Sequence, residues 1–182
     1  MSTRALYIGL MSGTSIDAVD AVLVDLASPA PYLIATHSHP IADDLRDAIL
    51  ALCSGDVESL TALGETHIAL GELFAQASLR LLDLADVAAN DVAGIGSHGQ
   101  TIWHAPNGDK PFTLQIGDAN IIAELTGITT VSDFRSRDIA AGGQGAPLAP
   151  LLHQHQFASA RASRAIINIG GISNITFLSP ET

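Results

Sequence analysis

The 182-residue sequence predicts an α/β fold in which helices flank a mixed sheet. Short apolar segments rich in Val and Ile alternate with helical patterns, and they lie at residues 5–10, 19–26, 92–96, 128–131 and 165–169. A short polar turn joins the first two segments, which indicates a β-hairpin. Hydrophobic residues make up 47% of the chain, enough to build a core around such a sheet.

Three helices are expected between these segments. One spans residues 40–53, where Pro40 opens the pattern, and a longer one spans about 56–85. Its apolar stripe consists of Leu60, Leu63, Leu70, Phe74 and Leu81. His67 falls on this stripe and is expected to be a core histidine whose ring nitrogens are hydrogen-bonded. Asp118 and Gly127 have the positions of an N-cap and a C-cap for the third helix.

The end of the chain repeats the design of its beginning. An apolar segment at 165–169, a small polar turn at 170–174 and another apolar segment at 175–178 follow a polar connection at 159–164. We therefore expect a first lobe at residues 1–158 and the start of a second, similar lobe at 159–182. Because no helix follows to cover the last strand pair, we also expect the chain to stop inside that second lobe.

Composition excludes several functional classes. The formal charge is −11 and Lys110 is the one lysine, so binding to nucleic acid or to an anionic membrane surface is not expected. No apolar run reaches the roughly 18–20 residues of a membrane span, and no signal peptide is evident at the N-terminus. Cys53 cannot form an internal disulfide, which fits a cytoplasmic protein, and its helical pattern favours a buried, inert thiol.

The turn after the first apolar segment carries the strongest chemical signal. Residues 12–15, Ser-Gly-Thr-Ser, place small donors around Gly13, where the backbone can approach an anion closely. Asp17 beside this turn could hold Mg²⁺ through water, as bound nucleotide phosphates require. Taken alone, the turn is more typical of a polar surface loop.

Three further motifs lie between the two hairpins. Residues 96–101, Gly-Ser-His-Gly-Gln-Thr, follow a strand, and their polar side chains suit sugar hydroxyls or an acetamido group. Residues 132–138 contain Arg135, whose guanidinium can bind two oxygens of a carboxylate or phosphate. Residues 142–148 form a Gly-rich loop that ends in Pro147-Leu148. Each motif alone is also typical of a turn, a structural ion pair or a flexible loop.

In this order the motifs resemble one family, anhydro-N-acetylmuramic acid kinase. The resemblance rests on Gly-Leu-Met-Ser-Gly-Thr-Ser-x-Asp, Ser-His-Gly-Gln-Thr, Gln-Ile-Gly-Asp, Asp-Phe-Arg-x-x-Asp-(x)₃-Gly-Gly-Gln-Gly-Ala-Pro-Leu and Asn-Ile-Gly-Gly-Ile-x-Asn, spread over residues 5–178. It implies an actin/hexokinase-type (ribonuclease H-like) lobe with ATP and Mg²⁺ between two lobes. It also implies hydrolytic opening of 1,6-anhydro-N-acetylmuramic acid with phosphorylation of O6, a step of cell-wall recycling. Ala18 departs from the family's usual Gly.

The resemblance also implies roles for individual residues. ATP phosphates would be bound by Gly13, Thr14, Ser15, Ile16, Asp17, Ala18, Val19 and Asp20. A second phosphate hairpin would comprise Asn168, Gly170, Gly171 and Asn174. The sugar would be bound by Ser97, His98, Gln100, Arg135 and Asp138, while the loop around Gln144 would shape the cleft. The family's catalytic aspartate is expected after Thr182, so no catalytic base is expected in this chain, and the 182 residues alone should be inactive.

Other interpretations stay open. An actin-like interaction protein would use the same hairpins for ATP without sugar chemistry, and a kinase for another sugar would differ little in sequence. The pairs His37/His39 and His153/His155 could each place two rings on one strand face, but neither pattern is typical of zinc. Trp103 suits a sugar-stacking platform less well than a packed loop anchor. A small-molecule substrate and ATP are the expected partners, and a homodimer is left open.

Overall fold

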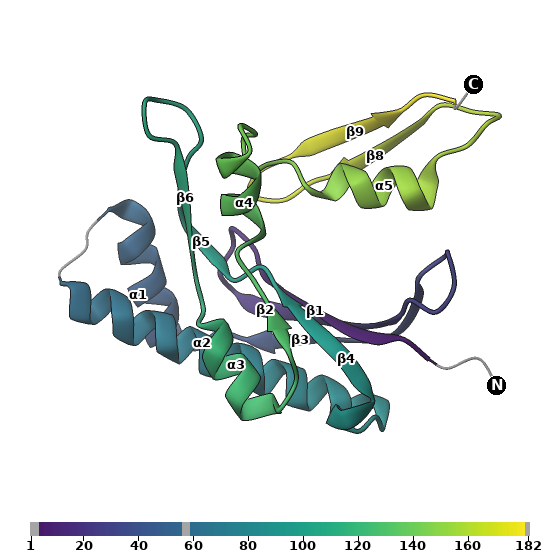
Figure 1. Ribbon diagram of the computed structural model, residues 1–182. Coiled ribbons are helices and arrows are strands. Elements are labelled where there is room, and N and C mark those ends of the chain that lie inside the picture. The colour runs from purple at the N-terminus through teal and green to yellow at the C-terminus, as the bar shows by residue number, and fades with distance from the viewer. Residues whose placement is uncertain (1–3, 56–58, 181–182) are drawn as a thin grey trace.

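The computed structural model, which describes residues 4–55 and 59–180, confirms an α/β fold with a mixed sheet (Figure 1). The strand order of the five-stranded sheet is β3-β2-β1-β4-β7. Antiparallel pairing joins β1 (Leu6–Ser12), β2 (Ala18–Asp25) and β3 (Tyr32–Pro40). Parallel pairing then adds β4 (Val92–Ser97) and β7 (Thr130–Val131) beyond β1. This order is consistent with an actin/hexokinase-type lobe.

Helices α1 (Asp43–Ser54), α2 (Leu60–Ala85) and α3 (Ala119–Thr126) complete this lobe. The long helix α2 runs along one face of the sheet, with α3 beside it (Figure 1). A short 3₁₀ turn, η1 (Ala89–Asp91), leads from α2 into β4. This helix was expected over about 56–85. Residues 56–58 lie outside the described residues, and α2 starts at Leu60.

The expected caps of α3 are confirmed. The side chain of Asp118 accepts a hydrogen bond of 2.7 Å from the N–H of Asn120, which satisfies a free donor at the start of the helix. Gly127 ends the helix in the left-handed region at φ 70°, a conformation that glycine adopts without steric cost.

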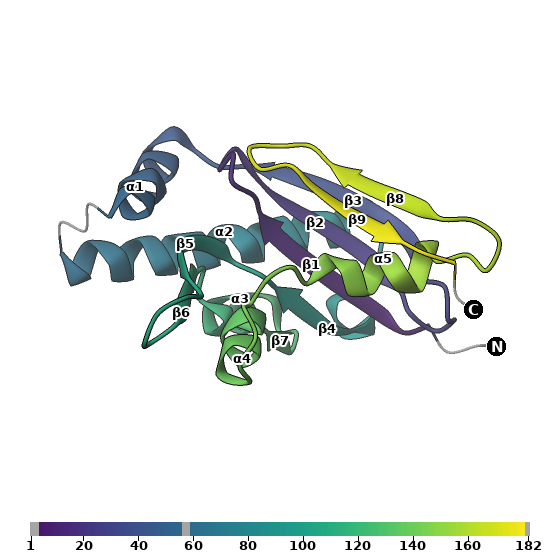
Figure 2. The same cartoon turned by 90° about the horizontal axis from the view of Figure 1, so that it is seen from above.

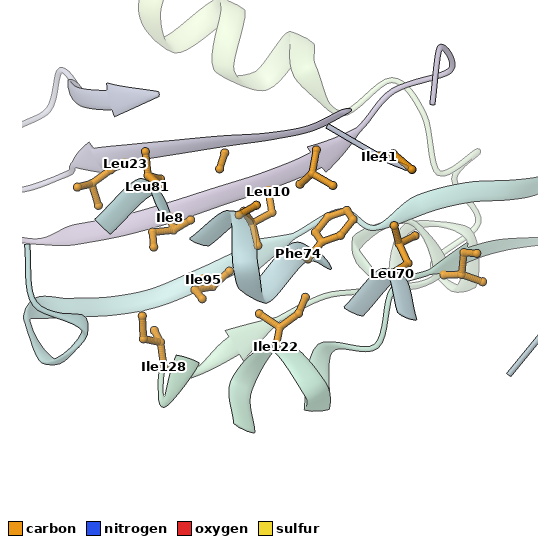
Figure 3. Close-up of a cluster of buried hydrophobic side chains, with 14 of the residues drawn as sticks. Ile8, Leu10, Leu23, Ile41, Leu70, Phe74, Leu81, Ile95, Ile122 and Ile128 are labelled. Carbon is orange, nitrogen blue, oxygen red and sulfur yellow. The ribbon is translucent and has the colours of Figure 1, made fainter. Parts of the chain in front are cut away.

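The core lies between the sheet and α2 (Figure 3). Leu70, Phe74 and Leu81 project from α2 against Ile8 and Leu23 of the sheet, and all five are fully buried. The three-and-four spacing on the helix and the alternation on the strands thus meet as the sequence pattern predicts. Leu60 does not belong to this stripe, because it is 83% exposed at the first helical position.

At the edge of the sheet one expectation was wrong and one strand was not predicted. Pro40 does not open a helix: it is the last residue of β3, and α1 begins at Asp43. The edge strand itself was not predicted, since its polar and histidine-rich sequence lacks a clear apolar alternation. Pro40 fits there because it is the final residue of an edge strand.

A second hairpin, β5 (Gln100–Ala105) with β6 (Phe112–Ile116), was also missed. It projects away from the main sheet beside α1 (Figure 1). Trp103 lies on this hairpin next to the end of α1, where a Cβ added to Gly55 would come within 3.5 Å of its ring. Trp103 is nevertheless 45% exposed and belongs to β5, so it is neither a loop residue nor fully packed.

The remaining elements follow β7. They are α4 (Phe134–Ala140), α5 (Ala149–Phe157), β8 (Arg164–Asn168) and β9 (Asn174–Leu178). Strands β8 and β9 form a separate antiparallel sheet, which lies with α5 on the side of the main sheet opposite α2 (Figures 1 and 2). The repeated strand–turn–strand design is therefore confirmed, while its assignment to a second lobe stays a prediction.

Within the described ranges, no helix is both long enough and apolar enough to cross a bilayer.

Candidate functional site

The first polar turn joins β1 to β2, with Ser12 paired to Val19 on either side of it. Ile16 holds the turn in place. Its side chain is only 2% exposed, and its N–H donates to the carbonyl of Gly13 over 3.3 Å. Its φ of 50° is unusual for a β-branched residue. Thr14 and Ser15 are exposed, and a Cβ added to Gly13 would contact nothing within 4 Å. The turn is therefore anchored by one apolar side chain and open around Gly13.

Asp17 provides an ionised carboxylate beside this turn. The Ser15 hydroxyl donates to Asp17 Oδ1, and this hydrogen bond lowers the pKa of Asp17 below its ordinary value. Among the described residues there is no group of three or more His, Cys, Asp or Glu that could hold a metal directly. An exposed carboxylate next to an open Gly turn fits a Mg²⁺ ion that keeps most of its water ligands.

The other residues expected to bind ATP belong to the start of β2. Val19 is fully buried in the core, so only its backbone faces the turn. Ala18 is half-buried and pairs with Pro40 as an ordinary strand residue, where a methyl group fits. Asp20 is exposed and pairs with Met11.

The second polar turn comes close to the first. Asn168 and Asn174 pair across the base of the β8–β9 hairpin, and the turn between them contains Gly170 and Gly171. A Cβ added to Gly171 would lie 2.7 Å from Oγ1 of Thr14. Figure 2 shows the two turns side by side although they are far apart in the sequence. The structure thus brings both expected phosphate hairpins together.

A cavity of about 280 Å³ lies next to the end of β4. Its lining comes from α2, β4 and the loop after it, β6, the start of α3 and the segment that opens α4. The lining residues are His67, Ser97, His98, Gly99, Thr113, Leu114, Gln115, Ile116, Gly117, Asp118, Ala119, Asn120, Ser132, Asp133 and Ser136. The cavity adjoins the first turn through β1, because the His98 N–H donates to the Leu10 carbonyl over 2.9 Å.

Of the five expected sugar-binding residues, Ser97 and His98 line this cavity, whereas Gln100, Arg135 and Asp138 do not. Ser97 Oγ and Gln100 Oε1 are buried without a hydrogen-bond partner in the part of the chain that the structure describes. Gln100 is only 3% exposed, and its amide N–H donates to the Thr101 carbonyl. It therefore lies behind the cavity rather than on its surface.

Both ring nitrogens of His98 are engaged. Its Nδ1–H donates to the Gly99 carbonyl over 2.9 Å, and its Nε2 accepts from Nε of Arg135 over 2.8 Å. Burial lowers the pKa of His98; the Gly99 carbonyl opposes this effect, and the positive Arg135 adds to it. Burial also lowers the pKa of Arg135. His98 is therefore held as a neutral imidazole of one tautomer.

Arg135 and Asp138 both hydrogen-bond to the Gly-rich loop. Nη1 of Arg135 donates to the Gly145 carbonyl over 2.6 Å, and Oδ2 of Asp138 accepts from the Gly145 N–H over 2.7 Å. Gly143 packs directly against the Asp138 carboxylate, leaving no room for a Cβ. One turn of α4 thus fixes both backbone groups of Gly145 and ties the loop to His98.

His67 is not the core histidine expected from the apolar stripe. Its side chain is 38% exposed and lines the cavity, where Nδ1 accepts from the Gly117 N–H over 3.1 Å and Nε2 lies 3.8 Å from Asp118 Oδ2. The expected hydrogen bonding of the ring is present at Nδ1 only, because 3.8 Å from Nε2 to Asp118 is beyond hydrogen-bond distance. The side chain of His67 faces the loop that leads into α3, whereas that of its neighbour Thr66 is buried.

Sequence reasoning missed the cavity residues of β6 and of the α3 N-terminus. Thr113 and Gln115 alternate along β6, and Asn120 follows the Asp118 cap. The Gln-Ile-Gly-Asp motif at 115–118 was the available signal, because a polar–apolar–Gly–cap pattern marks a strand that enters a helix.

The two histidine pairs differ. His37 and His39 do share one face of β3, with Nε2 of the first 3.2 Å from Nδ1 of the second. His153 and His155 do not share a strand face, because they lie on α5 and make separate contacts with Thr176 Oγ1 and the Pro29 carbonyl.

Comparison with known proteins places this geometry in a family. Residues 5–182 match the family model described as anhydro-N-acetylmuramic acid kinase. A curated relative of that name from Coxiella burnetii is 56% identical over 172 residues, which cover 94% of this chain and 46% of the relative. Relatives of the same name from Vibrio vulnificus and Vibrio cholerae are each 51% identical, and this chain covers 49% of each. The chain thus spans about half the length of the curated relatives it matches. With nearly every residue inside the matched range, it belongs to the anhydro-N-acetylmuramic acid kinase family.

Proposed function

We propose that this chain supplies one lobe of an ATP-dependent kinase that converts 1,6-anhydro-N-acetylmuramic acid and water to N-acetylmuramic acid 6-phosphate. In this reaction water adds at C1, the C1–O6 bond breaks, and O6 receives the γ-phosphoryl group of ATP with release of ADP. The membership of the family and the name of its relatives support the reaction. The division at residue 158 into a first lobe and the start of a second belongs to the same proposal.

The observation that carries the proposal is the meeting of two polar turns beside a polar cavity. Thr14 of the first turn lies against Gly171 of the second, so a phosphate chain held by one turn would lie within reach of the other. The cavity adjoins the same end of β1 through His98 and Leu10. Phosphoryl transfer depends chiefly on such positioning of donor and acceptor.

In this proposal the first turn binds the ATP phosphates through the backbone and hydroxyl groups of residues 13–15, with Asp17 holding Mg²⁺ through water. The bound ion neutralises charge that develops on the transferred phosphoryl group. The second turn, with Asn168, Gly170, Gly171 and Asn174, closes on the phosphates from the other side. The base that activates water is assigned to a segment outside this chain.

The sugar is assigned to the cavity, with Ser97 and His98 in its wall and Gln100, Arg135 and Asp138 behind or beside it. A cavity separate from the phosphate turns favours a sugar kinase over an actin-like interaction protein, which needs nucleotide sites alone. A kinase for another sugar is the second candidate, and comparison of sugar substrates separates the two. The lone cysteine and the charge of −11 support a cytoplasmic enzyme without nucleic-acid or membrane partners.

The test is a product assay with ATP and Mg²⁺ on a protein that carries this chain at the full length of its relatives. Formation of the 6-phosphate from the anhydro sugar is expected, and substitution of His98 or Arg135 by Ala should impair it far more than His37→Ala. No product with any anhydro sugar, or equal activity of all three variants at saturating ATP, would contradict the assignment.

A further inference from the structure

The cavity contains a hydrogen-bond acceptor whose orientation is fixed by its neighbours. This acceptor is Oε1 of Gln115, on β6, which is buried and has no hydrogen-bond partner among the described residues. Buried polar atoms in folded proteins are nearly always paired, so such an atom in the wall of a cavity indicates a ligand group.

The amide of Gln115 cannot turn its oxygen away. Its nitrogen donates to Oγ1 of Thr113 over 2.7 Å and to Oγ1 of Thr101 over 3.1 Å, which uses both of its hydrogens. The hydroxyl of Thr113 itself donates to the Trp103 carbonyl over 3.3 Å, so toward Gln115 it acts as an acceptor. A hydroxyl that accepts must face the nitrogen of the Gln115 amide. The group of this amide that is left without a partner is therefore its oxygen.

A second unpaired group lines the same cavity. Oγ of Ser97, at the end of β4, has no hydrogen-bond partner in the described chain, and the residue is fully buried. A hydroxyl can donate where the Gln115 oxygen can only accept. The cavity therefore offers one acceptor on β6 and one donor on β4, with apolar atoms of Leu114, Ile116 and Ala119 in the same lining.

We propose that Gln115 and Ser97 together recognise the acetamido group of an amino sugar, an inference that rests on the proposed function. A secondary amide presents its N–H and C=O in opposite directions because the peptide-like bond is trans, so its partners have to stand on different elements. Gln115 Oε1 accepts the N–H, Ser97 Oγ donates to the C=O, and the acetyl methyl group contacts the apolar part of the lining.

The chemistry of the proposed substrate narrows the choice of donor. In 1,6-anhydro-N-acetylmuramic acid a single bridging oxygen, O6, joins C1 to C6, so neither position carries a hydroxyl, and O3 carries the lactyl ether. The amide N–H and the O4 hydroxyl are then its remaining donors at neutral pH. Of these two groups, the amide is the one that combines a donor, an acceptor and a methyl group, as this lining requires.

The experiment compares two ligands by calorimetry on a protein that carries this chain at the length of its relatives. One ligand is the anhydro sugar, and the other is its analogue with the acetamido nitrogen replaced by oxygen, which keeps the C=O and the methyl group but lacks the N–H. We expect the wild type to bind the amide at least about 10-fold more tightly, since a buried acceptor left unpaired is costly. Gln115→Leu should reduce this preference to about threefold or less, while Gln154→Leu, an exposed glutamine on α5, should leave it unchanged.

The outcomes separate this inference from the proposed function. If the wild type binds both ligands equally, or if Gln115→Leu retains the full preference, the role of Gln115 is overturned while the kinase assignment stands. If the wild type binds and phosphorylates neither sugar, the proposed function fails and the inference with it. If Gln115→Leu does not fold, the wild-type ligand comparison and Thr113→Val, which removes one hydroxyl that orients the amide, still decide the question: an undiminished preference in Thr113→Val counts against the inference.

Discussion

Arg135 donates its Nε–H to Nε2 of His98 across 2.8 Å, and this bond links helix α4 to the end of strand β4. Because the other ring nitrogen donates to the Gly99 carbonyl, the two contacts together select the tautomer with its proton on Nδ1. The same guanidinium holds the Gly145 carbonyl. The pair therefore joins three segments that meet beside the cavity, and in this conformation it leaves neither nitrogen of His98 free for a ligand.

We predict that nitrogen NMR of His98 reports the Nδ1–H tautomer near neutral pH. Arg135→Leu should raise the pKa of His98, because it removes a positive charge and a donor that both favour the neutral ring. Long-range proton–nitrogen correlation spectra over a pH series measure both quantities. His104, whose Nδ1 contacts Thr113 on the other hairpin, provides the internal reference. An Nε2–H tautomer in the wild type would contradict the assignment.

The depressed pKa of His98 also predicts how stability depends on pH. Below the unfolded pKa of about 6.5 the unfolded chain binds a proton that the folded chain excludes. Stability should therefore be highest above that pH and should fall as pH decreases toward the folded-state pKa. His39, whose pKa is lowered by burial and by His37, contributes in the same direction. Urea unfolding at pH 7.5 and pH 5 measures the loss, which His98→Gln should reduce. An equal loss in the variant would exclude His98 as a source.

Two glycines of α2 should respond oppositely to the same substitution. Gly64→Ala should stabilise the chain by about 0.5–1 kcal/mol, because alanine favours the helix and its Cβ would contact nothing within 4 Å. At Gly71 the Cβ would lie 2.8 Å from the backbone oxygen and 2.9 Å from the backbone nitrogen of Asp118. Gly71→Ala should therefore destabilise by about 1–3 kcal/mol through forced separation of α2 from α3. Urea unfolding of both variants at one pH tests the pair, and a similar effect at both positions would refute the packing argument.

Asp138 should control the order of the Gly-rich loop. Its carboxylate accepts the Gly145 N–H over 2.7 Å, and hydrogen bonds to charged groups contribute about 1.5–3 kcal/mol. Asp138→Ala should accelerate hydrogen exchange at the Gly145 amide by at least about 10-fold. Asp109→Ala, in an exposed loop, is the matched control. Unchanged exchange at Gly145 would show that the loop holds its shape without this carboxylate.

How far sequence predicted the structure depended on the type of signal. The strands around Ile8, Leu23 and Ile95 have strong apolar patterns, and the caps Asp118 and Gly127 have a local chemistry that fixes a helix end, so both were predicted. The edge strand around His37 was missed because none of its residues is fully buried and its half-buried face carries His37 and His39, so no apolar alternation marks it. The β5–β6 hairpin was missed because Trp103, Phe112 and Leu114 are all partly exposed.

In the candidate site, too, local sequence signals were predicted and long-range contacts were not. Motifs contiguous in sequence placed Ser97, His98 and the two turns correctly beside one another in space. The contacts that determine the role of each side chain in the site are long-range, however. Arg135 contacts His98, which is 37 residues away in the sequence, and Gln115 contacts Thr101, which is 14 residues away. No local spacing carries that information, which is why Arg135 was expected on the sugar and is found on a histidine and a loop.

The apposition of the two turns predicts a specific effect at Gly171. A Cβ there would lie 2.7 Å from Oγ1 of Thr14, whereas a Cβ at Gly170 would contact only the Ile172 carbonyl at 3.8 Å. Because Thr14 is an exposed side chain that can rotate away, Gly171→Ala should change stability by less than about 0.5 kcal/mol. It should nevertheless disturb the hydroxyl that the proposed function assigns to the ATP phosphates. Gly171→Val, which adds two further methyl groups at the same contact, should disturb it more.

We expect ATP affinity at fixed Mg²⁺ to decrease from wild type to Gly171→Ala to Gly171→Val, with a smaller effect of Gly170→Ala than of Gly171→Ala. Titration calorimetry on a protein of the relatives' length measures the series, and thermal unfolding without nucleotide verifies that stability is retained. Thr14→Ala separates the causes: it removes the atom that the new Cβ meets, so Gly171→Ala should have little additional effect in that background. If the two substitutions instead act additively, the turns function independently and their contact does not shape the nucleotide site.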